Sequence, residues 1–168
     1  ATLYVDYSVD GGSTWASSTL ASASATTGSV TTASGRIIGI NTASANAVTF
    51  VWDSKANGVT STTNAVIRLA GADAYGLGVY RQSATFTVDN VPLSAPATPT
   101  VASSTTSTLA ITWATVSGAS SYTVSSTLGA TTTVATTILY TGLSPNASYN
   151  FQVLDTDAYG NTSTYSSI

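Results

Sequence analysis

The sequence predicts an all-β protein made of two tandem antiparallel β-sandwiches, and three observations support this fold class. Apolar residues occupy alternate positions from Tyr149 to Val153, a period that is typical of a strand with one buried face. Three of the four prolines lie within residues 91–99, which predicts a stiff linker. The tetrapeptide Asp-Ala-Tyr-Gly occurs at 73–76 and again at 157–160, as expected for one sandwich per repeat.

The first sandwich is predicted to span residues 1–90 and to lack its first strand. A complete sandwich has one more strand ahead of its present start, so we expect the strand that begins near Leu3 to have a free hydrogen-bonding edge. Small polar residues between 16 and 35 predict a long loop after a short strand. Further strands are expected at 36–40, 48–52 with Trp52 facing inward, 65–70 and 84–88.

The second sandwich, residues 100–168, is predicted to contain a full set of strands after the Pro-rich linker 91–99. Alternation places Trp113 on the inner face of its second strand. Leu143, Pro145 and Tyr149 predict a corner where the chain crosses between sheets. The central strand at 149–155 follows, and a polar strand at 162–167 ends the chain.

The composition excludes several functions. His, Cys and Glu are absent, which removes the usual imidazole bases, thiolate nucleophiles and zinc sites, so an enzyme is not expected. Only four Lys or Arg residues and a net charge of −3 argue against nucleic-acid binding. No apolar run is long enough for membrane insertion. A surface of hydroxyl side chains with 7% charged residues favours an extracellular, secreted or cell-surface location.

One short motif in the first half predicts a tight hairpin. The octapeptide from Ser8 to Trp15 matches the Asp-box pattern Ser-x-Asp-x-Gly-x-Thr-Trp. Asp10 is expected to accept backbone N–H groups, Gly12 to allow positive φ, and Trp15 to pack beneath the turn. A sialidase is not indicated, because a propeller repeats its blades and this motif occurs once.

Both halves resemble repeats of prokaryotic cell-surface proteins. Residues 95–168 resemble a fibronectin type III domain through Leu109-x-Ile-x-Trp113 and Leu143-x-Pro145-x-x-x-Tyr149. The resemblance implies that the Tyr149 hydroxyl bonds an upstream backbone group. Residues 1–90 resemble an immunoglobulin-like repeat through the hairpin motif, Trp-Asp-Ser at 52–54 and Phe-Thr-Val-Asp-Asn at 86–90.

Two kinds of polar site are candidates. Asp89, Asn90, Asp155 and Asp157 are candidate Ca²⁺ ligands, although no Asp-x-Asp-x-Asp loop is present, and solvated turn carboxylates are the alternative. Apart from Ca²⁺, no cofactor is expected. Asn146 and Asn161 begin sequons and are candidate N-glycosylation sites.

These features favour a non-enzymatic structural module of a bacterial or archaeal filament, fibre, surface layer or adhesin stalk. Residue 1 is Ala, so the chain is expected to be a processed form or a piece of a longer protein. The expected partners are copies of the chain, or neighbouring domains, added through a β-strand at the first sandwich. The alternative is a carbohydrate-binding, adhesive or spacer module in which exposed tyrosines such as Tyr4, Tyr75, Tyr80 and Tyr159 contact glycans.

Overall fold

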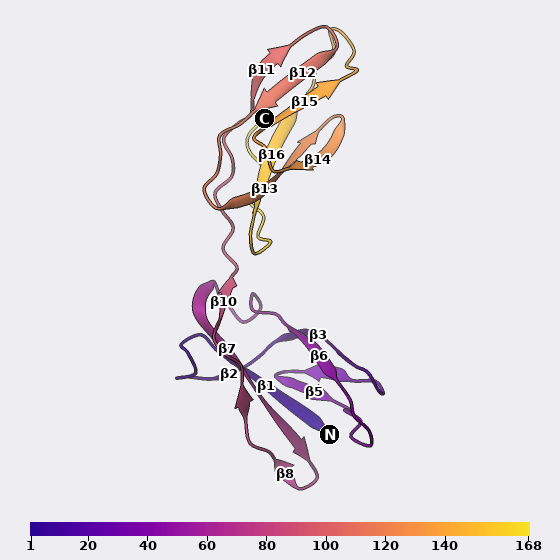
Figure 1. The fold of residues 1–168 in the computed structure, drawn as a ribbon, viewed down its shortest axis with the longest axis vertical. Coiled ribbons are helices and arrows are strands. Elements are labelled where there is room, and N and C mark those ends of the chain that lie inside the picture. The colour runs from indigo at the N-terminus through magenta and orange to yellow at the C-terminus, as the bar shows by residue number, and fades with distance from the viewer. The chain divides into compact units, whose positions relative to one another are not determined.

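The computed structural model describes residues 1–168, which form strands, turns and loops without any helix. This confirms the all-β fold class. The chain divides into two compact units, Ala1–Asn90 and Val91–Ile168, called here the first unit and the second unit (Figure 1). The absence of helices means that the structure offers no helical segment able to span a bilayer.

The main sheet of the first unit is antiparallel, with the strand order β10-β7-β1-β5-β4. The short strand β2 pairs with β1, and β8 and β9 pair with β7. The strands of this sheet are β1 (Thr2–Ser8), β2 (Ala16–Ser17), β4 (Thr31–Ala33), β5 (Arg36–Ile38), β7 (Ser61–Asp73), β8 (Gly76–Leu77), β9 (Arg81–Gln82) and β10 (Phe86–Asp89).

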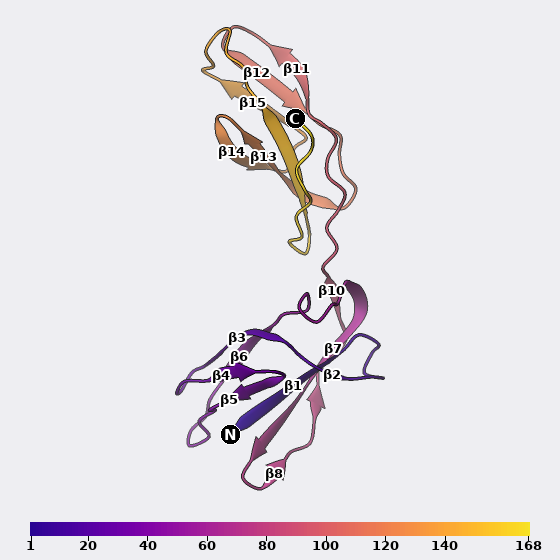
Figure 2. The same cartoon turned by 180° about the vertical axis from the view of Figure 1, so that it is seen from behind.

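The expectation that the first strand has a free edge is wrong. Strand β1 pairs with β7 along its whole length, from Thr2 to Ser8. Its other edge pairs with β5 and with β2. It is therefore an interior strand of the sheet, as Figure 2 shows from behind.

The second sheet of the first unit has only two strands, β3 (Leu20–Ala25) and β6 (Val48–Trp52). Strands β3 and β4 both lie within residues 16–35, so the long loop expected there is wrong. Side chains in that stretch are small and give little apolar signal, but the backbone still forms paired strands. The incomplete layer of this unit is therefore the β3–β6 sheet and not the sheet that contains β1.

The second unit has two three-stranded sheets, with the orders β11-β12-β15 and β14-β13-β16. Its apolar core lies between them and includes Ile111, Trp113, Val124 and Val153, all buried. The ring of Trp113 meets that of Tyr122 edge-on at 5.6 Å. The strands are β11 (Thr100–Ser104), β12 (Thr108–Thr112), β13 (Ala119–Ser126), β14 (Gly129–Thr133), β15 (Thr137–Thr141) and β16 (Phe151–Asp157).

The polar strand expected at 162–167 forms only one isolated bridge, between Thr156 and Thr162. The segment still follows β16, because Ser163 N–H and Ser166 N–H donate to β16 carbonyls. In return, the two serine hydroxyls accept from the N–H groups of Asp155 and Val153, at 3.0 and 3.1 Å. Serine side chains thus replace part of the backbone ladder, which breaks the regular strand pattern.

The predicted corner forms at the start of β16. The Tyr149 hydroxyl accepts a hydrogen bond from Ser144 N–H at 3.0 Å. Leu143 N–H donates to Ser107 O, and Pro145 precedes Asn146, which adopts a positive φ of 58°. The corner therefore holds the crossing segment with one side-chain bond and one backbone bond.

We predict that Tyr149→Phe lowers the free energy of unfolding of the second unit by about 0.5–1.5 kcal/mol, because the Ser144 N–H loses its acceptor. Urea denaturation measures the change. The matched control is Tyr140→Phe, since the Tyr140 hydroxyl is buried without a partner, and its removal should be neutral or stabilising. Equal losses in both variants would contradict the role of the corner.

Candidate functional site

The free edge of β6 is the first element of the candidate site. Asp53 N–H donates to Thr19 O, and Ala47 O accepts from Thr26 N–H. At both ends of β6, the backbone groups that point toward β3 therefore belong to odd-numbered residues. In an antiparallel pair, alternate residues direct their backbone groups to opposite sides. The N–H and C=O groups of Val48, Phe50 and Trp52 therefore point away from β3, where β6 has no neighbouring strand.

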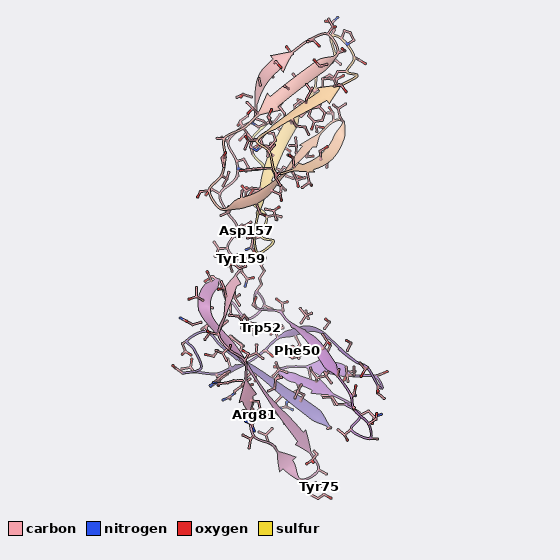
Figure 3. All side chains as sticks on the ribbon, viewed as in Figure 1. Phe50, Trp52, Tyr75, Arg81, Asp157 and Tyr159 are labelled. Atoms are coloured by element: carbon pink, nitrogen blue, oxygen red, sulfur yellow. The ribbon has the colours of Figure 1, made fainter.

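An apolar groove of about 410 Å³ lies beside this edge. It is lined by Phe50, by Ile67 and Leu69 of β7, by Phe86, and by the segment 81–83. The four apolar side chains remain partly exposed, and Phe86 is 38% exposed. Figure 3 labels Phe50 and Trp52 of β6 and Arg81 of β9.

The groove exists because the two layers of the first unit overlap only in part. Strand β3 contacts β4, so the two-stranded sheet covers the β5–β4 side of the main sheet. Trp52 contacts Tyr7 at 4.9 Å and Phe86 at 6.4 Å between ring centroids, which anchors the end of β6 above β1 and β10. Beyond these contacts the inner face of β7 has no covering strand.

In the second unit, a strand occupies the place that is open beside β6 in the first unit. The hairpin after β7 and the hairpin after β16 share one turn, in which Tyr75 N–H donates to Asp73 Oδ1 and Tyr159 N–H donates to Asp157 Oδ1, both at 2.8 Å. Strand β7 therefore corresponds to β16. Strand β1, which pairs with β7, corresponds to β13, which pairs with β16. Strand β6 precedes β7 as β15 precedes β16, so these two strands also correspond. In the second unit β15 pairs with β12 from Thr108 to Thr112, whereas β6 has no such neighbour.

The opposite face of the main sheet carries a partly buried ion pair instead. Both Nε and Nη2 of Arg68 contact Asp6 Oδ2, at 3.0 and 2.9 Å. The guanidinium lies between two rings, 4.4 Å from the centroid of Trp15 and 4.1 Å from that of Tyr80. Burial, followed by the Asp6 charge, raises the pKa of Tyr80. These contacts fasten the β2 and β9 segments to the sheet.

The hairpin at 8–15 has the hydrogen bonds expected of its turn. The Asp10 carboxylate accepts from Thr14 N–H at 2.9 Å, from the Thr14 hydroxyl at 2.6 Å and from the Ser8 hydroxyl at 2.7 Å. These bonds, led by that of the Thr14 hydroxyl, lower the pKa of Asp10. Gly12 has a φ of 94°, and a Cβ there would lie 3.3 Å from the Trp15 ring. The Asp10 carboxylate thus accepts its hydrogen bonds from residues of the same turn.

The candidate Ca²⁺ ligands are distributed over both units. Asp89 and Asn90 end the first unit, where the Asn90 side chain donates to Ser54 Oγ and Val59 O. The Asp157 carboxylate accepts from Tyr159 N–H and Asn161 N–H and from the Asn161 amide, and this last bond leads the causes that lower the pKa of Asp157. The structure contains no group of three or more acidic side chains arranged as a metal site.

Asp155 differs from the other carboxylates because it faces the core. It lies on the same side of β16 as Phe151 and Val153 and is fully buried, and neither carboxylate oxygen has a hydrogen-bond partner. The hydroxyl proton of Ser163 goes to Thr164 O instead. Burial raises the pKa of Asp155, and the charge of Asp157 adds to the effect.

We predict that the second unit becomes less stable as the pH rises, and that Asp155→Asn abolishes this loss of stability. The folded unit retains the Asp155 proton at pH values where the unfolded chain, with an Asp pKa of about 3.9, has lost it. Unfolding then releases a proton, so the free energy of unfolding falls as the pH rises above about 4 until the folded group ionises.

Urea unfolding of the second unit, followed by its amide NMR signals between about pH 3 and pH 7, measures this dependence. Asp157→Asn is the control of opposite sign, because a lowered pKa stabilises the folded unit at neutral pH and the gain is lost on acidification. An unchanged pH profile in Asp155→Asn would contradict a buried proton at this position.

The two sequons differ in accessibility. Asn146 is exposed on a turn with positive φ, as an acceptor site requires, and remains a prediction. Asn161 is 4% exposed, and its side-chain nitrogen, the atom that would carry a glycan, donates to Asp157 Oδ2 at 2.9 Å. The folded chain therefore does not present Asn161, which argues against that half of the prediction.

The tyrosines suggested as a glycan platform have different local surroundings. Tyr4 lies beneath the Arg36 guanidinium, and Tyr80 stacks on Arg68. Tyr75 is 99% exposed on the turn between β7 and β8, and Figure 3 shows it at the tip of this hairpin. Tyr159 is exposed on the corresponding turn of the second unit.

Comparisons with known proteins identify the fold. No family model matches the chain, and no curated protein matches it. It is similar to the solved FN1–FN3 domains of chicken CNTN1, with a TM-score of 0.54 and 14% identity, over 98% of this chain and 51% of that chain. The chain has a fibronectin type III-like tandem fold.

Two further solved structures are similar at lower scores. A segment of two fibronectin type III domains from chicken tenascin gives a TM-score of 0.41 and 12% identity, over 98% of this chain and 81% of that chain. A titin segment gives 0.48 and 14%, over 98% and 53%. The chain thus spans about half the length of the CNTN1 and titin fragments.

Sequence reasoning missed two parts of the site and proposed a ligand residue outside it. It placed the free edge on β1 and overlooked β6, because it did not foresee that β5 and β2 return to cover β1. It gave Asn57 no part in the site, but the side-chain oxygen Oδ1 of Asn57 accepts from Trp52 Nε1 at 2.8 Å and from Thr19 N–H at 2.7 Å. It also proposed Asp155 as a ligand, although strand alternation from Phe151 already places it inward.

Proposed function

We propose that this chain is a non-enzymatic structural module of an extracellular assembly on a bacterial or archaeal surface, such as a filament, fibre, surface layer or adhesin stalk. The observation that carries the proposal is the apolar groove beside the edge of β6, which no strand of residues 1–168 covers. An apolar groove and a strand edge that face solvent are unfavourable in an isolated protein and are typical of surfaces that bind another chain.

The composition supports this role. The chain carries few charges and many hydroxyl side chains, so neighbouring copies approach without strong repulsion. Repetition of a head-to-tail contact that does not close on itself builds an open filament.

Electron microscopy combined with size-exclusion chromatography tests the proposal. We expect the protein isolated from its native surface to form fibres or ordered arrays, and the separate chain to associate in a concentration-dependent way. A native protein that is monomeric at all concentrations, with no ordered material at the cell surface, would refute the structural role.

An adhesive module is the second candidate, and the hairpin after β7 favours it. Tyr75, Leu77 and Val79 are 99%, 54% and 83% exposed, so an apolar tip projects from the first unit. A glycan array tests this alternative. Binding to a defined glycan that is lost in Tyr75→Ala and kept in the control Tyr159→Ala would support adhesion through this tip, whereas no binding would exclude glycans as its target.

A further inference from the structure

We propose that the edge of β14 in the second unit pairs with the β14 edge of a second copy of this chain, antiparallel and with a two-fold axis at Thr131. This inference rests on the proposed assembly function and names one contact between its subunits. A two-fold contact closes on itself, so it joins copies in pairs and is distinct from the head-to-tail contact that extends a filament.

The open edge of β14 belongs to the middle of the second unit. Strand β14 ends the sheet of order β14-β13-β16, and the segment 158–168 runs along β16, at the other end of that sheet. The linker enters the unit at β11, in the other sheet. Figure 2 shows β14 at the margin of the unit. The edge is therefore set by β13 and β15, the strands before and after β14, and not by the segments that enter and leave the unit.

The backbone of β14 has free hydrogen-bonding groups on its outer side. The two-residue turn at 127–128 makes Ser126 and Gly129 a bonded pair, and bonded pairs recur at every second residue of the β13–β14 ladder. The N–H and C=O groups of Ala130 and Thr132 therefore point away from β13, to the side where no strand lies. Such groups are the basis of recognition by β-strand addition.

The edge of β14 lacks the features that usually block strand addition. Proteins protect exposed edges with charged side chains, proline or bulges. Strand β11 has a bulge between Val101 and Ser103, and Ser163 and Ser166 bond along the outer side of β16. Strand β14 keeps a regular register with β13, and residues 100–144 contain neither a proline nor a charged side chain. The edge of β14 is therefore accessible to a further strand.

The spacing of the exposed apolar side chains identifies the partner as a second copy. Leu128 and Val134 are 47% and 81% exposed, and each lies three residues from Thr131. An antiparallel pair centred on Thr131 places Ala130 of one copy opposite Thr132 of the other, which joins the free backbone groups. The same register places Leu128 of one copy opposite Val134 of the other, at both ends of the pair. The edge thus matches itself, as a two-fold contact requires.

The charge of the second unit favours contact between identical surfaces. Its only charged side chains are Asp155 and Asp157, and both are buried. Two copies therefore meet at β14 without the repulsion that like charges opposite each other would cause. Strand β15 also has an uncharged open edge, but Leu139 is its only strongly exposed apolar side chain. Self-pairing of β14 therefore offers the larger apolar contact.

The direct test is amide hydrogen exchange, read by NMR as the concentration of the chain is raised to about 1 mM. Exchange should slow at Ala130 and Thr132 and stay unchanged at Gly129 and Thr131, whose N–H groups bond to β13. We expect association of the separate chain to be weak, because one strand pair is a small interface. No slowing at Ala130 and Thr132, or slowing along β15 instead, would overturn the proposal.

Variants at position 131 test the two-fold register. Thr131→Lys and Thr131→Glu each place like charges opposite each other, so each should weaken pairing by about two- to fivefold at low salt. An equal mixture of the two variants should restore pairing, because the introduced charges are then opposite in sign. Thr106→Lys, on the exposed turn between β11 and β12, is the control and should leave pairing unchanged. A mixture that pairs no better than its separate components would contradict this register.

Variants at position 132 separate the edge bonds from general folding. Thr132→Pro removes an N–H that points away from β13, and proline is tolerated in an edge strand. It should weaken pairing about tenfold, because symmetry removes two hydrogen bonds. Thr132→Ala keeps the N–H and should stay within about threefold. Equal pairing by these two variants would show that the outer backbone groups of β14 are not used.

Disulfide formation tests the contact in the assembled protein, because the chain contains no cysteine. Thr131→Cys should link copies on mild oxidation, since residues opposite each other in an antiparallel pair lie within disulfide reach. Ala130→Cys is the control, because that position lies opposite Thr132 and not opposite itself. Equal linking of both variants would overturn the register. Native assembly without a link at position 131 would refute this contact and leave the structural role intact, whereas linking of the separate chain without ordered native material would refute the role and retain the contact.

Discussion

A sheet with one apolar face is stable in water only when a second layer covers that face. The second unit meets this requirement with two sheets of three strands, and the core side chains between them, such as Ile111 and Val153, are buried. The first unit meets it in part. Its fully covered apolar residues, such as Val5 and Ile37, lie at the centre, while Phe50 and Phe86 lie at an open margin.

Polar side chains complete what the short strands leave unpaired. Asn57 joins the end of β6 to the start of β3, and Ser163 and Ser166 replace ladder bonds along β16. The two serines satisfy the buried N–H groups of Val153 and Asp155, which would otherwise lack partners. The abundance of Ser, Thr and Asn in the sequence is therefore partly a structural requirement of irregular strands.

The fold class and most strands were predictable because they depend on local patterns. Leu109, Ile111 and Trp113 alternate, and the Asp-Ala-Tyr-Gly turns follow strongly apolar strands. The site depends on long-range pairing that no local pattern contains. Strand β1 is interior only because Ile37 and Ile38 return to pair with its start, far along the chain. Small residues such as those of β3 also form strands without an apolar signal.

The order of strands in the main sheet has a mechanical consequence. Strands β1 and β10 both run antiparallel to β7 and lie on its two sides, so they are parallel to each other. Tension applied between Ala1 and Asn90 therefore pulls β1 and β10 in opposite directions along β7. Such a load shears the seven residue pairs of β1 and β7, and the three pairs of β10 and β7, instead of opening them one by one. The first unit is thus arranged to resist stretching along its chain.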